Sequence, residues 1–469
     1  MNSERIACGS GSPDMSAQTR IAGLTLRVIS LLLITVLPAR AQAPLTIGLK
    51  DAADRVIEAN PLVLAAHQDV LSSEKQLSRA WREFVPTITT NARYSYLDDD
   101  IALSVNPITL PLPPAGITIR VPPVHLLDRS TLRADVTATM PLFTGFRIAS
   151  GISASRHLVK DATAQDTLAM QRAVAATLVA YHQCLLADRL AGAREEAYAT
   201  VTAHQKRVES LQQQGIATQY DRIRADLALS EARKSLEESR NGRLVAYALL
   251  KKQLALPDTL TLVLSDTLSF VPYPVELEAA IGEARMSRPE IHSIMEKQET
   301  VRAMSNAEMG KMLPQIGAFA RYEFIEKSLT QLDPRWVVGV SASLTIFNGL
   351  KDLASSQVYD IQEEKLTNVG EEVGNSVALE VRKYHADKNT AEQQIASAQT
   401  SLRLALEALR MADLRFSTGA GTSLEVLDAQ TAVVAGKTSY ALALYNYRTA
   451  TIELVRSIAR TDALFRGVF

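Results

Sequence analysis

Two widely separated segments of the chain carry the same polar residues at the same spacing. Each has a glycine, a threonine three residues later, a carboxylate after three more and an alanine after a further four. Threonine is a preferred helix N-cap, and a carboxylate in the first turn is favoured by the positive end of the helix dipole. The pattern therefore predicts two helices that begin after glycine-containing turns. The matching residues are Gly215, Thr218, Asp221 and Ala225, and Gly419, Thr422, Glu425 and Ala429.

Other residues that could do chemistry are scattered. The seven histidines form no HExxH motif, and the chain has neither a GxSxG motif nor a phosphate-binding P-loop. His182 and Cys184 could form one corner of a metal site, but two ligands alone favour a histidine on a helix surface and a buried thiol. We therefore expect no enzyme activity, no cofactor and no metal. The net charge of −1 argues against nucleic acid as a partner.

The chain reads as two copies of one plan. Several pairs of short segments match in the same order, which indicates an internal duplication. An insertion in the first copy, Leu97 to Arg129, contains six prolines and is predicted to be a loop. The matching pairs are Asn60-Pro61-Leu62 with Arg288-Pro289-Glu290-Ile291, Pro86-Thr87-Ile88 with Pro314-Gln315-Ile316, and Leu142-Phe143-Thr144-Gly145 with Ile346-Phe347-Asn348-Gly349.

Each copy contains two segments in which apolar and polar residues alternate. They span residues 87–96, 132–142, 316–324 and 336–346, a length that suits tilted transmembrane strands of roughly ten residues. An ordinary soluble sheet is the alternative, but aromatic residues near the hairpin ends favour the membrane. Four strands cannot close a barrel, so the pattern predicts a barrel shared between chains. The aromatic residues are Tyr94, Tyr96, Tyr322, Phe324 and Trp336.

Each copy also contains a long segment that favours helix. Residues 147–213 and 350–417 lack proline, and unbroken helices of this length reach roughly 100 Å. Gly370 and Gly374 are expected to soften the second one. A return helix should follow each turn, over 218–255 and 422–460, with Thr218 and Thr422 as N-caps. A plain soluble coiled coil is the alternative interpretation.

The N-terminal region has the features of a signal peptide. Arg20 and Arg27 precede a short apolar run, and Ala41-Gln42-Ala43 offers a cleavage site. The predicted organisation is a signal peptide at 1–43, a first repeat at 44–255, a linker at 256–275 and a second repeat at 276–469. The first repeat has its hairpin at about 85–143 and its helical pair at about 147–255, and the second has them at about 314–347 and 349–465.

Several of these segments together resemble the TolC-like outer-membrane efflux family. They are Asn60-Pro61-Leu62, Pro86-Thr87-Ile88, Pro141-Leu142-Phe143-Thr144-Gly145 and Gly421-Thr422-Ser423-Leu424-Glu425-Val426-Leu427-Asp428-Ala429. The resemblance implies a mainly α fold with a transmembrane β-barrel. A long α-helical barrel would join a β-barrel shared by a homotrimer, with four strands from each chain. It also implies a periplasmic adaptor and an inner-membrane transporter as partners, and contact with outer-membrane lipid.

The resemblance also assigns roles at the periplasmic entrance. Glu425 and Asp428 match the acidic ring, and Asp221 matches a carboxylate that locks the tips. Ordinary charged residues at helix starts remain the alternative interpretation. Gly421 stands where the family pattern has a locking arginine and Phe416 where it has a tyrosine, so Arg222 and Arg224 are candidate substitutes. The predicted tip turns are those of Gly215 and Thr218 and of Gly419, Gly421 and Thr422.

The function implied by the resemblance is that of a passive exit duct in a tripartite efflux pump or a type I secretion system. It would lie in the outer membrane of a Gram-negative-type cell and have a large periplasmic part. A periplasmic coiled-coil adaptor or scaffold without a barrel is the alternative, although no lipoyl-like β domain separates the predicted helices.

Overall fold

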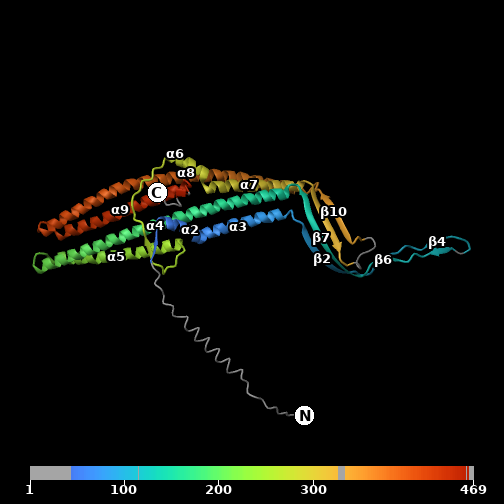
Figure 1. Ribbon diagram of the computed structural model, residues 1–469, viewed down its shortest axis with the longest axis horizontal. Coiled ribbons are helices and arrows are strands. Elements are labelled where there is room, and N and C mark those ends of the chain that lie inside the picture. Colours follow the sequence, from blue (N-terminus) through green and yellow to red (C-terminus); the bar gives the residue numbers. More distant parts are fainter. Residues whose placement is uncertain (1–43, 115, 326–332, 461, 464–469) are drawn as a thin grey trace, which may run out of the picture. The chain divides into compact units, whose positions relative to one another are not determined.

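The computed structural model describes residues 44–114, 116–325, 333–460 and 462–463 (Figure 1). The predicted signal peptide at 1–43 lies outside these residues. Of the described residues, 44–46 and Thr259–Val263 form a small unit, and the others form a large unit. Short strands β1 (Leu45–Ile47) and β8 (Leu262–Leu264) pair with each other.

The remaining elements belong to the large unit, which is mainly helical. Two shorter helices, two long strands, a long helix and a return helix follow one another twice. No helix in the described part of the chain is both long and apolar enough to cross a membrane. The elements of the first series are α2 (Leu49–Ala59), α3 (Pro61–Arg82), β2 (Thr87–Tyr96), β7 (Ser130–Thr144), α4 (Arg147–Gln213) and α5 (Gln219–Gln253). Those of the second are α6 (Leu277–Ser287), α7 (Pro289–Met309), the 3₁₀ turn η1 (Gly310–Met312), β9 (Gln315–Glu323), β10 (Trp336–Ser343), α8 (Lys351–Ser417) and α9 (Ser423–Ser457).

The four long strands form one antiparallel sheet in the order β10-β9-β7-β2. The alternation predicted from the sequence is confirmed, because the register aligns apolar residues across all four strands, as in the row of Ile88, Ala138, Ala320 and Val338. This apolar face is exposed in the single chain: Ile88 is 72% and Val338 69% exposed. The expected fourth strand is too long, because β10 ends at Ser343 and Leu344 to Ile346 have no strand partner.

The insertion in the first copy is not the irregular loop that its prolines suggested. It contains four short strands, and β3 (Ile101–Leu103) pairs with β6 (Val124–Leu127) while β4 (Ile108–Leu110) pairs with β5 (Ile117–Ile119). The prolines lie between these strands, where no ladder hydrogen bond requires an N–H group. The insertion is thus an extension of the hairpin formed by β2 and β7.

The long helices α4 and α8 each span 67 residues without a break. Both begin after a glycine in the left-handed region, Gly145 with φ 58° and Gly349 with φ 73°. The surroundings of these glycines differ. A Cβ atom on Gly145 would lie 2.1 Å from the carbonyl oxygen of Gly310, whereas nothing lies within 4 Å of one on Gly349.

The core lies where the shorter helices cover the long ones. One buried cluster joins α2 and α3 to α4 and α9, and a second joins α6 to α8 and α9. Arg288, only 5% exposed, adds a buried ion pair to Glu380 at 2.7 Å. Burial opposes ionisation of Glu380, but Arg456 and Arg288 together hold its pKa below the ordinary value. This polar network ties the start of α7 to α8 and α9.

Candidate entrance at the helical tips

The turn between α4 and α5, here called the first tip, is closed by the predicted residues. Gly215 adopts a left-handed φ of 74°, and the amide of Ile216 donates to the carbonyl of Leu211 at 2.9 Å. Thr218 is the N-cap of α5, and its hydroxyl accepts from the Asp221 amide at 3.1 Å. The predicted N-cap is therefore confirmed, and Figure 1 shows this turn at the end of the helices remote from the sheet.

The turn between α8 and α9, the second tip, repeats this geometry. Gly419 has φ 76°, and the amide of Ala420 donates to the carbonyl of Arg415 at 2.8 Å. The hydroxyl of Thr422 accepts from the Glu425 amide at 3.2 Å, which confirms the second N-cap. Both tips thus use a left-handed glycine and a threonine cap.

The carboxylates of the two tips have different partners. Asp221 turns back on its own cap, because its Oδ2 accepts from the Thr218 amide at 3.0 Å and from the Thr218 hydroxyl at 2.6 Å. Glu425 accepts a longer bond from its own cap, at 3.4 Å from the Thr422 hydroxyl to Oε1, and also reaches the preceding helix, where its Oε2 lies 3.3 Å from Nε of Arg415. Asp428 is exposed and makes no hydrogen bond or ion pair with any described residue. Within the described part of this chain, no such contact joins Asp221 to Glu425 or Asp428.

The arginine at the second tip comes from a position that the sequence did not suggest. A Cβ atom on Gly421 would lie 2.9 Å from Cβ of Arg415, so the turn has no room for a side chain there. Arg415 itself binds the Ala420 carbonyl oxygen at 3.1 Å as well as Glu425. Gly421 therefore leaves the space that Arg415 needs. The family pattern does not suggest a role for Arg415, because that pattern has its arginine at position 421.

The two arginines suggested as substitutes contact their own helical pair in this chain. Arg222 lies 3.2 Å from Glu209 of α4 and 3.8 Å from Asp226 of α5. The guanidinium of Arg224 lies over the ring of Tyr220, 5.6 Å from its centroid. Both therefore stiffen the first tip.

His204 of α4 links the first helical pair to the second tip. Its Nε2 lies 2.8 Å from the hydroxyl of Ser423 at the start of α9, and its ring lies 5.2 Å from that of Phe416. The side chain is only 4% exposed, and burial, reinforced by Arg207 and opposed by Asp413, lowers the pKa of His204. Sequence reasoning missed this residue because its partners lie more than 200 positions away.

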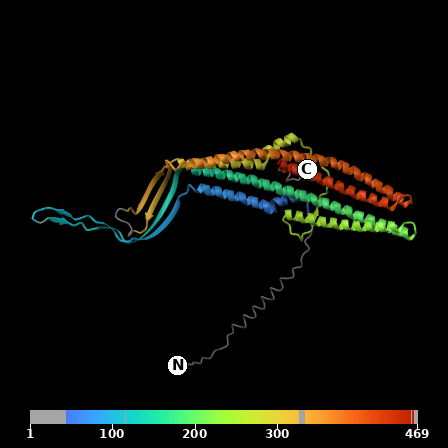
Figure 2. The same cartoon turned by 180° about the vertical axis from the view of Figure 1, so that it is seen from behind.

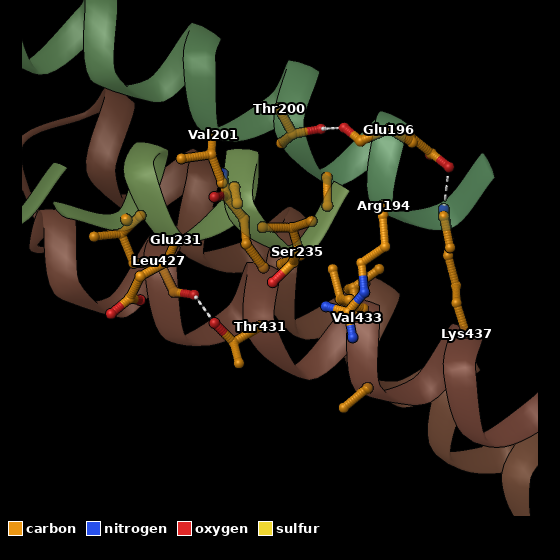
Figure 3. Close-up of a pocket in the computed structure, with 18 of the residues that line it drawn as sticks. Arg194, Glu196, Thr200, Val201, Glu231, Ser235, Leu427, Thr431, Val433 and Lys437 are labelled. Carbon is orange, nitrogen blue, oxygen red and sulfur yellow. Dashed lines mark hydrogen bonds and ion pairs between the residues drawn. The ribbon is translucent and has the colours of Figure 1, made fainter. Parts of the chain in front are cut away.

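A cavity of about 420 Å³ lies between the two helical pairs (Figure 3). Arg194 of α4 points across it toward Val433 of α9, and Glu196 pairs with Lys437 at one end. The lining contains no histidine or cysteine, and Gln430 places a buried amide oxygen without a hydrogen-bond partner beside it. The cavity therefore brings together no nucleophile with a histidine base.

The paired residues His182 and Cys184 are both buried. The sequence placed the histidine on a helix surface, and this is wrong: His182 is 4% exposed and Leu178 O lies 2.8 Å from its Nδ1. Burial lowers its pKa to about 4. Cys184 is fully buried, as expected, and burial raises its pKa to about 12. Because little of this thiol is ionised at neutral pH, Cys184 is expected to be unreactive.

Several solved structures with this fold are outer-membrane channels. The chain matches the outer-membrane channel OprN with a TM-score of 0.69 and 16% identity over 87% of this chain and 89% of that chain. The Campylobacter jejuni CmeC outer membrane channel gives 0.70 and 15%, with 87% and 85% covered. The open state of the Neisseria gonorrhoeae MtrE outer membrane channel gives 0.68 and 18%, with 87% and 88% covered. At these identities the likeness establishes that the chain shares the fold of these channels.

The sequence profile described as outer membrane efflux protein matches residues 52–255 and 280–460. Since these segments make up most of the chain, it belongs to the outer membrane efflux protein family. No curated protein matches the chain. The protein resides in the outer membrane and serves as the exit duct of an efflux pump. The resemblance noted in the sequence, and the function and location expected from it, are thereby confirmed.

Proposed function

We propose that the duct is a homotrimer in which three copies of the sheet close a barrel of twelve strands. The main support is the apolar face of the sheet. Side chains from all four strands share it, and Trp336, Val338 and Val340 are each at least 65% exposed in the single chain. An exposed apolar face of this size requires a cover, and the opposite face carries Asn91, Asp135 and other polar groups suited to a wet interior.

The edges of the sheet give a second reason for sharing. Strands β2 and β10 end the order, so each presents unpaired backbone groups to its outer side. Such groups cost several kcal/mol each in hydrocarbon. Pairing β10 of one copy with β2 of the next satisfies them and closes the ring. A periplasmic scaffold or adaptor without a barrel leaves both the edges and the apolar face without a role.

Outer-membrane fractionation tests this proposal. The mature chain should be extracted with detergent as a trimer that dissociates on heating, as seen by electrophoresis of heated and unheated samples. A chain that is folded, monomeric and soluble without detergent contradicts it.

We also propose that the two series of elements arose by duplication, with a repeat at 44–255, a linker at 256–275 and a second repeat at 276–469. The matched strand-to-helix turns at Gly145 and Gly349 and the matched tips support this division. The remote tips would then surround the periplasmic entrance, where an adaptor and an inner-membrane transporter dock in a tripartite pump or a type I secretion system.

The entrance is proposed to select cations through Glu425 and Asp428. Three copies of each carboxylate around one narrow pore attract cations and repel anions. The doubly neutralised variant Glu425→Gln with Asp428→Asn should lose cation selectivity and block by trivalent cations in planar bilayers. The matched control, Glu364→Gln with Glu371→Gln, removes the same charge from exposed positions in the first third of α8, far from the tip, and should change neither. If the two variants show the same cation selectivity and the same block, Glu425 and Asp428 do not form a selective ring.

A further inference from the structure

The hairpin extension formed by residues 97–129, here called the arm, is unusually apolar for an exposed segment. It projects from the ends of β2 and β7 on the side away from the helices (Figures 1 and 2). All ten Ile, Leu and Val residues between positions 101 and 124 are 41–57% exposed, and Arg120 is the sole charged residue in that stretch. A surface of this kind is normally covered by a partner.

The outer ladder of the arm, β4 with β5, has two unlike faces. Ile108 lies opposite Ile119 and Leu110 opposite Ile117, so four aliphatic side chains share one face. The other face carries Thr109 and Thr118, whose hydroxyl oxygens lie 3.3 Å apart. Two isolated strands are marginally stable in water, so the aliphatic face must be buried for the ladder to persist.

The base of the arm is acidic, which bears on what covers the aliphatic face. Four aspartates gather there, and Asp100 accepts a hydrogen bond from the Arg129 amide at 2.6 Å. Arg129 in turn lies over Tyr96, in the aromatic row that ends the sheet. The arm therefore starts beyond a belt of carboxylates, outside the hydrocarbon of the membrane. With two arginines against four aspartates, it also lacks the basic residues that bring a segment to an anionic lipid surface. The aspartates are Asp98, Asp99, Asp100 and Asp128.

We propose that the aliphatic faces of three arms pack against one another around the threefold axis above the outer mouth of the duct. The proposal rests on the trimer proposed above. Closed threefold symmetry holds the arms at one height around one axis, so identical apolar faces are brought together at high local concentration. The threonine faces then point to water. A second copy of the arm is thus the partner whose chemistry fits, and the packed arms narrow the exit.

Cysteine cross-linking in the full-length trimer distinguishes the two faces. Ile117→Cys places a thiol on the aliphatic face, and Thr118→Cys is the matched control on the other face of the same strand. Of the two native cysteines, Cys8 lies in the predicted signal peptide, and Cys184 is fully buried and does not compete. Mild oxidation should link chains covalently in Ile117→Cys at least tenfold faster than in Thr118→Cys. Equal rates, or no links in an intact trimer, overturn the packing of arms while leaving the trimer standing. A chain that forms no trimer refutes the proposed function instead.

A spin label at position 117 separates arm packing from lipid contact. Packed arms should shield the label from both dissolved oxygen and a water-soluble nickel chelate, whereas a label at position 118 should collide freely with the chelate. High oxygen and low chelate accessibility at 117 means that lipid covers the face, which overturns the proposal. As a functional readout, replacing residues 101–125 by Asn-Gly should leave the trimer intact and raise single-channel conductance at least twofold. An unchanged conductance contradicts the narrowing of the exit.

Discussion

The two tips share one backbone design but use their carboxylates differently. Each has a left-handed glycine and a threonine cap, yet Asp221 bonds only to its own cap while Glu425 bonds both to its cap and to Arg415 of the preceding helix. The first tip contacts its own helical pair, through Arg222 and Glu209, and is self-contained. The second tip is also tied to α4 of the other pair, through His204 and Ser423. The same turn can thus serve either as a self-contained cap or as a junction.

Of the variants that test this comparison, Gly421→Arg is expected to destabilise its tip most. The new side chain would meet Cβ of Arg415 at 2.9 Å and the amide of Phe416 at 3.0 Å, and neither can move without opening the turn. We expect a local loss of about 3 kcal/mol, the upper end of the range for overpacking. Hydrogen exchange of amides 415–425 measures it. The neighbouring exposed Ala420→Arg serves as control, and equal protection in the two variants would show that the space is not limiting.

His204→Ala should loosen the junction of the second tip with α4. It leaves the Ser423 hydroxyl buried without its partner, at a cost of about 2 kcal/mol. The wild-type protein should lose part of the same stabilisation at acidic pH, where His204 becomes protonated. Because the pKa of His204 is lowered, its contribution is complete above its ordinary pKa of about 6.5 and is lost as the pH falls from there toward the lower folded value. Hydrogen exchange of amides 423–430 at pH 7.5 and 5.5 should therefore differ in the wild type but not in the variant. His67→Ala, at an exposed histidine, should retain the difference.

The threonine caps test whether the two carboxylates act differently. Thr218→Ala and Thr422→Ala should each destabilise the following helix start by about 1 kcal/mol. The loss should be greater for Thr218, because its hydroxyl donates to Asp221 at 2.6 Å, whereas the hydroxyl of Thr422 lies 3.4 Å from Glu425. Protection of the first-turn amides of α5 and α9 reports the difference. A greater loss at Thr422 would reverse our assignment of the self-contained tip.

The smallest effect is expected from Arg415→Ala. The pair with Glu425 is exposed on both sides, so its contribution to stability should be close to zero and should vanish at high salt. The readout is protection of amides 418–425 in low salt and in molar salt. A large loss that persists in high salt would mean that the bond to the Ala420 carbonyl, rather than the ion pair, holds the turn.

Local pattern in the sequence was enough to predict most elements. The alternation at 87–96 coincides with β2, and the absence of proline located both 67-residue helices, because these signals depend only on neighbouring residues. The two strand pairs inside the insertion were not predicted. The many prolines there favour a loop, and each strand is only three or four residues long. Leu344 and Ile346 continue the alternation without pairing, since a strand also needs a partner in register.

The site was less predictable than the fold. The caps at Thr218 and Thr422 follow from sequence, but Arg415 and His204 act through contacts that no local spacing encodes. Nothing around His182 in the sequence distinguishes its buried position on α4 from a surface one. Arg415 becomes visible only when its own tip is folded, and His204 only when the two helical pairs are placed side by side.

The glycines that precede the long helices differ in the room they leave. Gly145 is wedged against the backbone of Gly310, so the joint between β7 and α4 is fixed by contact with the end of α7. Gly349 has no such neighbour, and the joint before α8 carries a local bond from the Asn348 side-chain amide to the Asp352 carboxylate. A side chain at position 145 would therefore have to displace the end of α7, whereas one at position 349 would meet open space and only the strain of a left-handed φ.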